Sequence, residues 1–213
     1  MRMSDHDSKP AGPRGTPAWR SPAAWVLLTL VVVCGLAWDL SSKWWAFRSI
    51  ADAPVVFTRE QALSTAPLSL LVPSHRPMVV VPNLLNFTLV LNPGAVFGIG
   101  AGKTGFFIAV TIIAVAFGVG VFVFATRSRD WMAHIGLGLI LAGGLGNLYD
   151  RLLYGCVRDF IHPLPKVRWP GTATEVWPYV SNVADLLLLV GMCLLLLHAW
   201  RGEKKTAPIV ATA

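Results

Sequence analysis

Four long apolar runs dominate the pattern of hydrophobic and polar positions along the chain. They lie at about residues 23–47, 104–126, 131–150 and 182–200. A helix needs about 20 predominantly apolar residues to cross the hydrocarbon core of a bilayer, and each run is close to that length or longer. The pattern therefore predicts an α-helical integral membrane protein with four transmembrane helices. A cleaved signal peptide is the competing interpretation of the first run, but no clear A-x-A site follows it.

The segments between the runs contrast with them. Residues 48–103 contain many prolines and short β-branched stretches such as MVVVPN and NFTLVLN, a pattern typical of short strands. Residues 151–181 form a long polar loop before the fourth run. We therefore expect one membrane domain over residues 23–200, in which a small strand-rich module and a polar loop connect the helices.

Charge adds an orientation to this picture. The chain carries a formal net charge of +7, and nine of its 18 Lys and Arg residues lie in the tails, 1–22 and 201–213, and in the short turn 127–130. Lys and Arg concentrate in cytoplasmic segments of membrane proteins. Both tails are therefore expected to be cytoplasmic, with the strand-rich module and the polar loop facing outward. The first tail is also rich in Pro and Gly, which indicates disorder.

Composition excludes several classes of function. Only 14% of the residues are charged and 54% are hydrophobic, whereas an ordinary soluble domain has roughly 25% charged residues. The basic residues outside the tails and the turn are scattered and form no patch for nucleic acid. The three cysteines form no C-x-x-C pair and the five histidines show no ligand spacing. We therefore expect no disulfide framework, no metal and no cofactor.

Polar residues at the ends of the runs are the candidates for function, because ionisable groups in a membrane are costly and usually functional. Asp39 and Lys43, in WDLSSKWW, are four residues apart, so they share one face of a helix and can form an ion pair. The pair either fixes the depth of the first helix in the membrane or takes part directly in a site.

The third run combines small and polar residues. Small residues recur every four positions, at Gly138, Ala142 and Gly146. Such a stripe favours close packing against another helix. Asn147 and Arg151 follow at the same spacing, with Asp150 beside them. This cluster needs partners at a membrane boundary, and for Asp150 and Arg151 a structural network that joins helices is the favoured interpretation.

Two further carboxylates, Asp159 in GCVRDFIH and Asp185 in SNVADLLLLV, border the fourth run. Asn182 lies one turn before Asp185. If brought together in a low-dielectric site, two carboxylates share one proton. One then acts as general base toward water and the other as general acid toward a carbonyl, as in aspartic proteases. The alternative is structural: Asp185 caps its helix, and Asp159 pairs with Arg158 or Arg151.

A glycine-rich turn precedes the second run. It opens at Asn92 in LVLNPGAVFGIG, where Gly94 and Gly98 permit unusual dihedral angles or a close backbone approach. Its structural interpretation is a simple turn between a strand and a helix.

Taken together, these motifs resemble those of the bacterial lipoprotein signal peptidases, the type II signal peptidases that process prolipoproteins. They occur in the family's order as D-x-x-x-K at 39–43, N-P-G-A-V-F-G at 92–98, G-G-L-G-N-L-Y-D-R at 143–151, G-C-V-R-D-F at 155–160 and N-V-A-D at 182–185. Each motif is weak alone, but five in order on a four-span scaffold are specific. The resemblance covers roughly residues 24–200.

The resemblance implies a four-helix membrane bundle with a small extracytoplasmic β-cradle, matching residues 48–103. It also implies an active-site loop that bears a short helix, matching residues 151–181. The family's catalytic aspartates map onto Asp159 and Asp185. Polar residues that support the dyad map onto Asn92, Asn147, Asp150, Arg151, Asn182, Asp39 and Lys43. Gly94 and Phe97 map onto the turn beside the substrate.

By the same resemblance, the expected activity is that of an aspartic endopeptidase of the bacterial inner membrane. It would cut a diacylglyceryl-modified prolipoprotein just before the lipid-bearing cysteine, by activating one water, without metal or covalent intermediate. The active site would lie near the outer face, in contact with membrane lipids. We expect a monomer that cyclic peptides of the globomycin type inhibit.

Three alternatives remain. A non-enzymatic four-span carrier or complex subunit would use buried carboxylates to relay protons or bind cations. A presenilin-like aspartic protease would carry G-x-G-D within a span, and this signature is missing here. A Ser/Lys signal peptidase would need a serine near a lysine base, and Ser41 and Ser42 are too close in sequence to Lys43 to suggest one.

Overall fold

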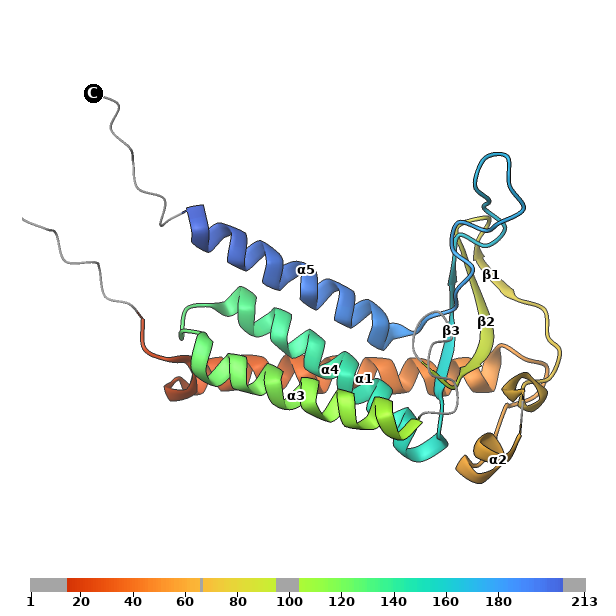
Figure 1. Ribbon diagram of the computed structural model, residues 1–213, viewed down its shortest axis with the longest axis horizontal. Coiled ribbons are helices and arrows are strands. Elements are labelled where there is room, and N and C mark those ends of the chain that lie inside the picture. The colour runs from red at the N-terminus through yellow and green to blue at the C-terminus, as the bar shows by residue number, and fades with distance from the viewer. Residues whose placement is uncertain (1–14, 66, 95–103, 205–213) are drawn as a thin grey trace, which may run out of the picture.

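Four long helices lie side by side, with a small sheet packed at one end of the bundle (Figure 1). The computed structural model describes residues 15–65, 67–94 and 104–204. The helices are α1 (Pro22–Ser49), α3 (Thr104–Ala125), α4 (Trp131–Tyr154) and α5 (Val183–Lys204). All four are long and apolar enough to cross a membrane. Phe97, most of the first tail and most of the second lie outside the described residues.

Helix α4 is the central helix of the bundle. In its most apolar stretch 56% of the residues are buried, against 11–22% in the other three helices. Large apolar side chains on the outer helices point away from the protein; Phe124 of α3, for example, is 89% exposed. In a membrane protein this outer surface meets lipid, so the bundle buries its polar residues around α4 and presents apolar side chains outward.

The predicted stripe of small residues on α4 packs against α1, and the two helices run in the same direction in matching steps of four residues. The contacts pair Val31 with Gly138, Gly35 with Ala142, Asp39 with Gly146 and Lys43 with Asp150. A Cβ on Gly35 would come within 2.8 Å of the Ala142 methyl group, and one on Gly146 would overlap the Asp39 carboxylate. Glycine is therefore required for this approach, which brings the polar ends of both helices together.

The sheet combines the two long segments between the spans. Strands β1 (Met78–Val81), β2 (Leu85–Asn92) and β3 (Val157–Pro163) are antiparallel in the order β1-β2-β3. The register of β2 and β3 runs from Leu85 opposite Pro163 to Asn92 opposite Val157. Phe47 of α1, Leu91 of β2 and Phe160 of β3 share the apolar core between the sheet and the helices.

One expectation for the loop 151–181 is wrong. No helix forms between β3 and α5, where turns and isolated bridges connect the two elements. The loop instead contributes β3 to the sheet. The short helices α2 (Arg59–Ser64) and η2 (Leu68–Leu71) lie in the segment 48–103. Helix α2 forms there because Thr58 and Gln61 make a capping box at its first turn.

The opposite end of the bundle is closed by the segment that precedes α1. Its short helix η1 (Ala18–Arg20) lies beside the turn between α3 and α4. The Ala18 N–H donates to the Thr126 carbonyl over 3.0 Å, and the Ser128 N–H donates to the Thr16 carbonyl over 2.8 Å. The start of α1 and the end of α5 both lie at this end, away from the sheet (Figure 1).

Two neighbouring glycines of α4 give a matched test of the packing. A Cβ on Gly143 would overlap the Ala184 carbonyl of α5, whereas one on Gly144 would meet the Val115 side chain at an ordinary 3.5 Å. We expect Gly143→Ala to lower the free energy of unfolding by about 1–3 kcal/mol through overpacking. Gly144→Ala should be neutral or stabilising by up to about 1 kcal/mol, because alanine favours helix. Unfolding in detergent by denaturant measures both, and equal stabilities would contradict this packing.

Candidate active site

Two aspartates from different elements meet at the sheet end of the bundle. Asp159 comes from β3 and is 1% exposed, whereas Asp185 comes from the first turn of α5 and is half-buried. Asn182 Nδ2 donates to Asp159 Oδ1 over 2.6 Å and to Asn147 Oδ1 over 3.1 Å. Asn147 Nδ2 in turn donates to Asp185 Oδ1 over 2.9 Å. The two carboxylates are thus joined by a bridge of two asparagine side chains.

Asp185 is held in place by the start of its own helix. The Asp185 N–H donates to Asn182 Oδ1 over 3.1 Å, and the Asn182 N–H donates to Asp185 Oδ2 over 3.2 Å. This reciprocal pair is a capping box with asparagine as the N-cap. The structural interpretation of Asp185 as a capping residue therefore describes one of its oxygens, while the other faces Asn147.

Asp159 is positioned by strand pairing. Asn92 ends β2 opposite Val157, and Asp159 lies two residues further along β3 on the same face of the sheet. Asn92 Nδ2 donates to Asp159 Oδ2 over 3.1 Å, while its Oδ1 accepts from the Gly94 N–H over 3.0 Å. The antiparallel ladder thus joins residues 67 positions apart in sequence.

The surroundings favour the protonated form of Asp159. Burial is the main cause and the neighbouring charge of Asp185 the second; together they raise the pKa of Asp159 from 3.8 to about 7. The hydrogen bonds from Asn182 and Asn92 oppose this shift, because they stabilise the ionised carboxylate. Asp159 can therefore hold a proton near neutral pH.

Arg151 of α4 is hydrogen-bonded to the turn that follows β2. Its Nη2 donates to the Gly94 carbonyl over 3.0 Å, and its Nη1 donates to the Asn147 carbonyl over 3.3 Å. The guanidinium also lies 5.3 Å from the centre of the Phe107 ring. Among the described residues Arg151 forms no ion pair within 4.0 Å, so its charge acts on the aspartates from a distance.

A second polar cluster lies next to the carboxylate pair, and Asn147 contacts both groups. The Lys43 side chain is completely buried, and its Nζ donates to Asp39 Oδ2 over 2.8 Å and to Asn147 Oδ1 over 3.0 Å. It also lies 3.5 Å from Asp150 Oδ2. The i,i+4 ion pair expected from the sequence is therefore present, and it also contacts the asparagine that holds Asp185.

The other oxygens of this cluster are satisfied as well. Asp39 Oδ1 accepts from the Ala184 N–H over 2.8 Å, in the first turn of α5. Asp150 accepts from Arg158 Nη2 over 2.7 Å, from Nε and from the Arg158 backbone N–H over 3.0 Å. Two acids and two bases balance in charge, which is the condition for burying ions in a low-dielectric interior.

The role of Arg158 was missed at the sequence level, where it was considered only as a partner of Asp159. It directly precedes Asp159 in β3, so the two side chains point to opposite faces of the strand. This alternation was the available signal for pairing Arg158 with α4. Every predicted site residue within the described ranges lies in this region of the structure. These residues are Asp39, Lys43, Asn92, Gly94, Asn147, Asp150, Arg151, Asp159, Asn182 and Asp185.

The ion cluster makes a specific prediction for stability. Lys43→Met leaves the buried Asp39 carboxylate without its cation, so we expect a loss of about 3–5 kcal/mol in the free energy of unfolding. Adding Asp39→Asn to this variant removes the unpaired charge and should restore part of the loss. Denaturant titrations of the two single variants, the double variant and the parent in detergent provide the comparison. An additive effect of the two substitutions would contradict the pairing.

Comparison with known proteins agrees with this architecture. Residues 30–201 match the model of a family described as Signal peptidase (SPase) II. A lipoprotein signal peptidase of Desulfitobacterium hafniense (strain DSM 10664 / DCB-2) is 39% identical over 130 residues, covering 60% of this chain and 78% of the relative. One from Pelotomaculum thermopropionicum is 38% identical over 146 residues, covering 68% of this chain and 85% of the relative.

Two solved structures have a similar fold. A bacterial membrane enzyme determined by the in meso method at 2.3 Å resolution superposes with a TM-score of 0.63 at 24% identity, covering 87% of this chain and 94% of that one. A second, at 1.9 Å resolution, gives a TM-score of 0.56 at 26% identity, covering 80% and 90%. With four spans, a three-stranded sheet and the matched family model, this chain belongs to the signal peptidase II family.

Proposed function

We propose that this protein removes signal peptides from diacylglyceryl-modified prolipoproteins, cutting before the lipid-bearing cysteine, with Asp159 and Asp185 as its catalytic pair. Membership of the signal peptidase II family supports the activity. One observation carries the residue assignment: the two carboxylates, from β3 and α5, are bridged by Asn182 and Asn147 at the sheet end of the spans.

In the proposed mechanism the pair shares one proton. Asp159, the more buried member, keeps the proton, and Asp185 is ionised and accepts a proton from a water molecule. The water oxygen attacks the scissile carbonyl carbon while Asp159 gives its proton to the carbonyl oxygen. The tetrahedral intermediate then breaks its C–N bond: Asp185 gives its proton to the leaving amine, and one hydroxyl of the intermediate returns a proton to Asp159 as the carboxylic acid forms. No covalent intermediate with the enzyme is needed.

Three asparagines keep the pair in a productive geometry. Asn92, Asn147 and Asn182 each donate an amide N–H to one of the carboxylates. Such donors fix side-chain orientation, which a reaction of this kind requires to within a fraction of an ångström. Arg151, which has no ion-pair partner among the residues that the structure describes, would stabilise the oxyanion that develops on the carbonyl oxygen.

We also propose an orientation in the bacterial cytoplasmic membrane, with both termini in the cytoplasm and the sheet outside. Arg20 of η1, Arg127 and Arg129 of the turn between α3 and α4, and Arg201 near the end of α5 belong to the end of the bundle away from the sheet, which supports this orientation. The catalytic pair then lies at the outer boundary of the bilayer, where a lipid-anchored cysteine is also placed. Acyl chains of the substrate would stay in the membrane while the peptide meets the sheet.

Cleavage of a purified diacylglyceryl-modified prolipoprotein tests this proposal. We expect Asp159→Asn and Asp185→Asn each to lower the cleavage rate by at least about 10²- to 10⁴-fold, because general acid–base catalysis is lost. Asp52→Asn, at an exposed aspartate near the end of α1, is the matched control and should cleave normally. Full activity in either dyad variant would show that its aspartate is structural. Inactivity of the folded parent would favour the non-enzymatic carrier.

The pH dependence tests proton sharing separately. A pKa of about 7 for Asp159 means that the rate falls as pH rises above this value, because the general acid is lost. Asn92→Ala removes a donor that stabilises ionised Asp159, so its alkaline limb should move to higher pH. An alkaline limb that stays in place or moves to lower pH would contradict this role.

A further inference from the structure

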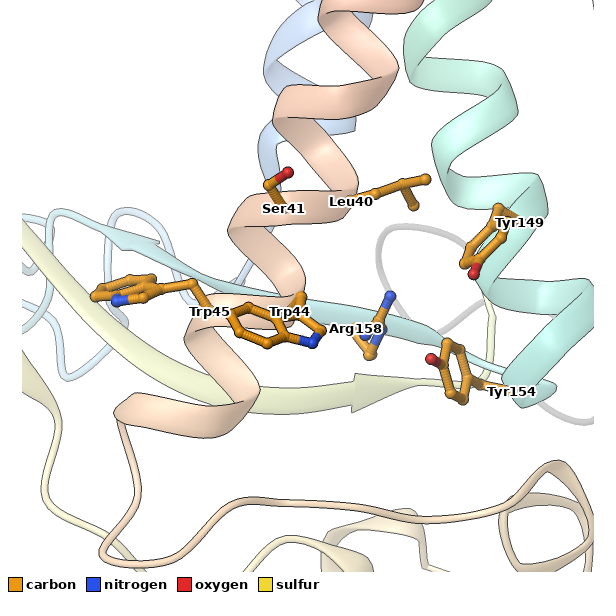
Figure 2. A pocket seen from close by; sticks show the side chains of 7 residues that line it. All are labelled: Leu40, Ser41, Trp44, Trp45, Tyr149, Tyr154 and Arg158. Carbon is orange, nitrogen blue, oxygen red and sulfur yellow. The ribbon is translucent and has the colours of Figure 1, made fainter.

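An open groove of about 570 Å³ lies between α1 and α4 at the sheet end of the bundle (Figure 2). Its walls include Leu40 and Trp44 of α1, Tyr149 and Tyr154 of α4, and Arg158 of β3. No acidic side chain lines it among the residues that the structure describes. The groove is therefore mainly aliphatic and aromatic, and its lining also includes the Ser41 hydroxyl and one guanidinium.

The groove is separate from the catalytic pair. On α4, Tyr149 lies two residues after Asn147, and two residues rotate about 200° around a helix of 3.6 residues per turn. Asn147 faces Asp185, so Tyr149 projects from the opposite side of α4. A molecule in the groove would contact the outer side of the ion cluster without entering the carboxylate site.

The groove presents unused hydrogen-bond donors. A guanidinium has five N–H groups, and Arg158 directs its Nε and Nη2 groups to Asp150. Its remaining N–H groups have no hydrogen-bond partner among the described residues. The same holds for the Trp44 indole N–H and for the hydroxyls of Tyr149 and Tyr154. All three aromatic groups turn their polar atoms toward the space around Arg158 (Figure 2).

A second arginine adds positive charge at the rim. The Arg48 guanidinium lies over the Trp44 ring, 4.5 Å from its centre. Arg158 is already neutralised by Asp150, with 2.7 Å between the charged atoms. The charge of Arg48 is not compensated in this way by an ion pair in the described part of the chain. An anionic ligand with several oxygen acceptors fits this combination of donors and charge.

The position of the groove indicates where such a ligand comes from. Trp44 is 56% exposed and Tyr149 is 40% exposed, near the ends of two spans. Exposed Trp and Tyr at the ends of spans lie at the level of lipid headgroups. Leu40, one turn deeper on α1, would lie beside the upper part of an acyl chain.

We propose that the groove between α1 and α4 binds an anionic glycerophospholipid from the leaflet at the sheet end. Its phosphate accepts hydrogen bonds from Arg158, Trp44 and Tyr154, with Arg48 over the headgroup, and an acyl chain follows α1 past Leu40. This lipid is distinct from the substrate proposed above, because it lies on the far side of α4 from the catalytic pair.

Lipid retention tests the site without any measurement of cleavage. The full-length protein is delipidated in detergent and titrated with dioleoylphosphatidylglycerol or with dioleoylglycerol, which lacks the phosphate. Native mass spectrometry counts bound lipids, and the melting temperature reports stabilisation by binding. We expect one retained phosphatidylglycerol per chain and no comparable retention of dioleoylglycerol. Equal retention of both lipids would overturn the phosphate site.

A matched pair of variants locates the binding. Trp44→Ala/Arg48→Gln should weaken phosphatidylglycerol binding roughly five- to tenfold. Trp19→Ala/Arg20→Gln removes the equivalent stacked pair at the other end of the bundle, where Arg20 lies 4.6 Å from the Trp19 ring centre, and should leave binding unchanged. Tyr154→Phe, which removes only a hydroxyl, should weaken binding severalfold and covers the case in which the double variant misfolds. Unchanged binding in both groove variants, or equal loss in the control pair, would overturn the proposal.

Discussion

The buried ammonium group of Lys43 is the constraint on which the arrangement of the helices depends. A charge removed from water costs several kcal/mol unless it is paired and hydrogen-bonded. Lys43 meets this condition only because Asp39 lies one turn away on α1 and Asp150 approaches from α4. Asp39 also accepts from the backbone of Ala184, so one ion pair fixes α1, α4 and the start of α5 relative to one another.

Close helix packing makes this pairing possible. The Lys43–Asp150 contact is the last of four contacts spaced one turn apart, and glycine occupies one member of each of the other three pairs. Larger residues at Gly35, Gly138 or Gly146 would separate α1 from α4 and pull the lysine away from its second carboxylate. The small-residue stripe therefore serves the polar cluster as well as helix association.

The same cluster orients the proposed catalytic pair through a single amide. Asn147 Oδ1 accepts from Lys43 Nζ and from Asn182 Nδ2, so its Nδ2 must face Asp185. The two polar groups differ in their charge balance. The ion cluster of Asp39, Lys43, Asp150 and Arg158 has as many bases as acids, whereas the pair of Asp159 and Asp185 forms no ion pair within 4.0 Å in the described part of the chain. Because no cation among the described residues pairs with them, the two carboxylates can reduce their mutual repulsion by sharing a proton.

The sequence predicts those features that depend on local spacing. Asp39 with Lys43 and Asn182 with Asp185 follow from helical periodicity, and the four spans follow from hydropathy. The pairing of Asn92 with Asp159 depends on the register of β2 against β3, which local patterns do not encode. The segment 151–181 contributes the strand β3 instead of the expected helix. This strand was not predicted because Val157–Phe160 are all buried, so they show no alternation between buried and exposed positions. The partner of Asp150 was missed because Arg158 was not assigned to a strand, so its side chain was not placed on the face opposite Asp159.

The central claim is that Asp159 and Asp185 hold one proton between them near neutral pH, and infrared spectroscopy tests it most directly. Difference spectra between pH 5 and pH 9 report the carbonyl band of protonated carboxyl groups. The account predicts a band that disappears with a midpoint near 7, is absent in Asp159→Asn and persists in the control Asp52→Asn. If no such band titrates between pH 5 and pH 9, as for a carboxyl with the ordinary pKa of about 4, or if the band survives in Asp159→Asn, the result would contradict it.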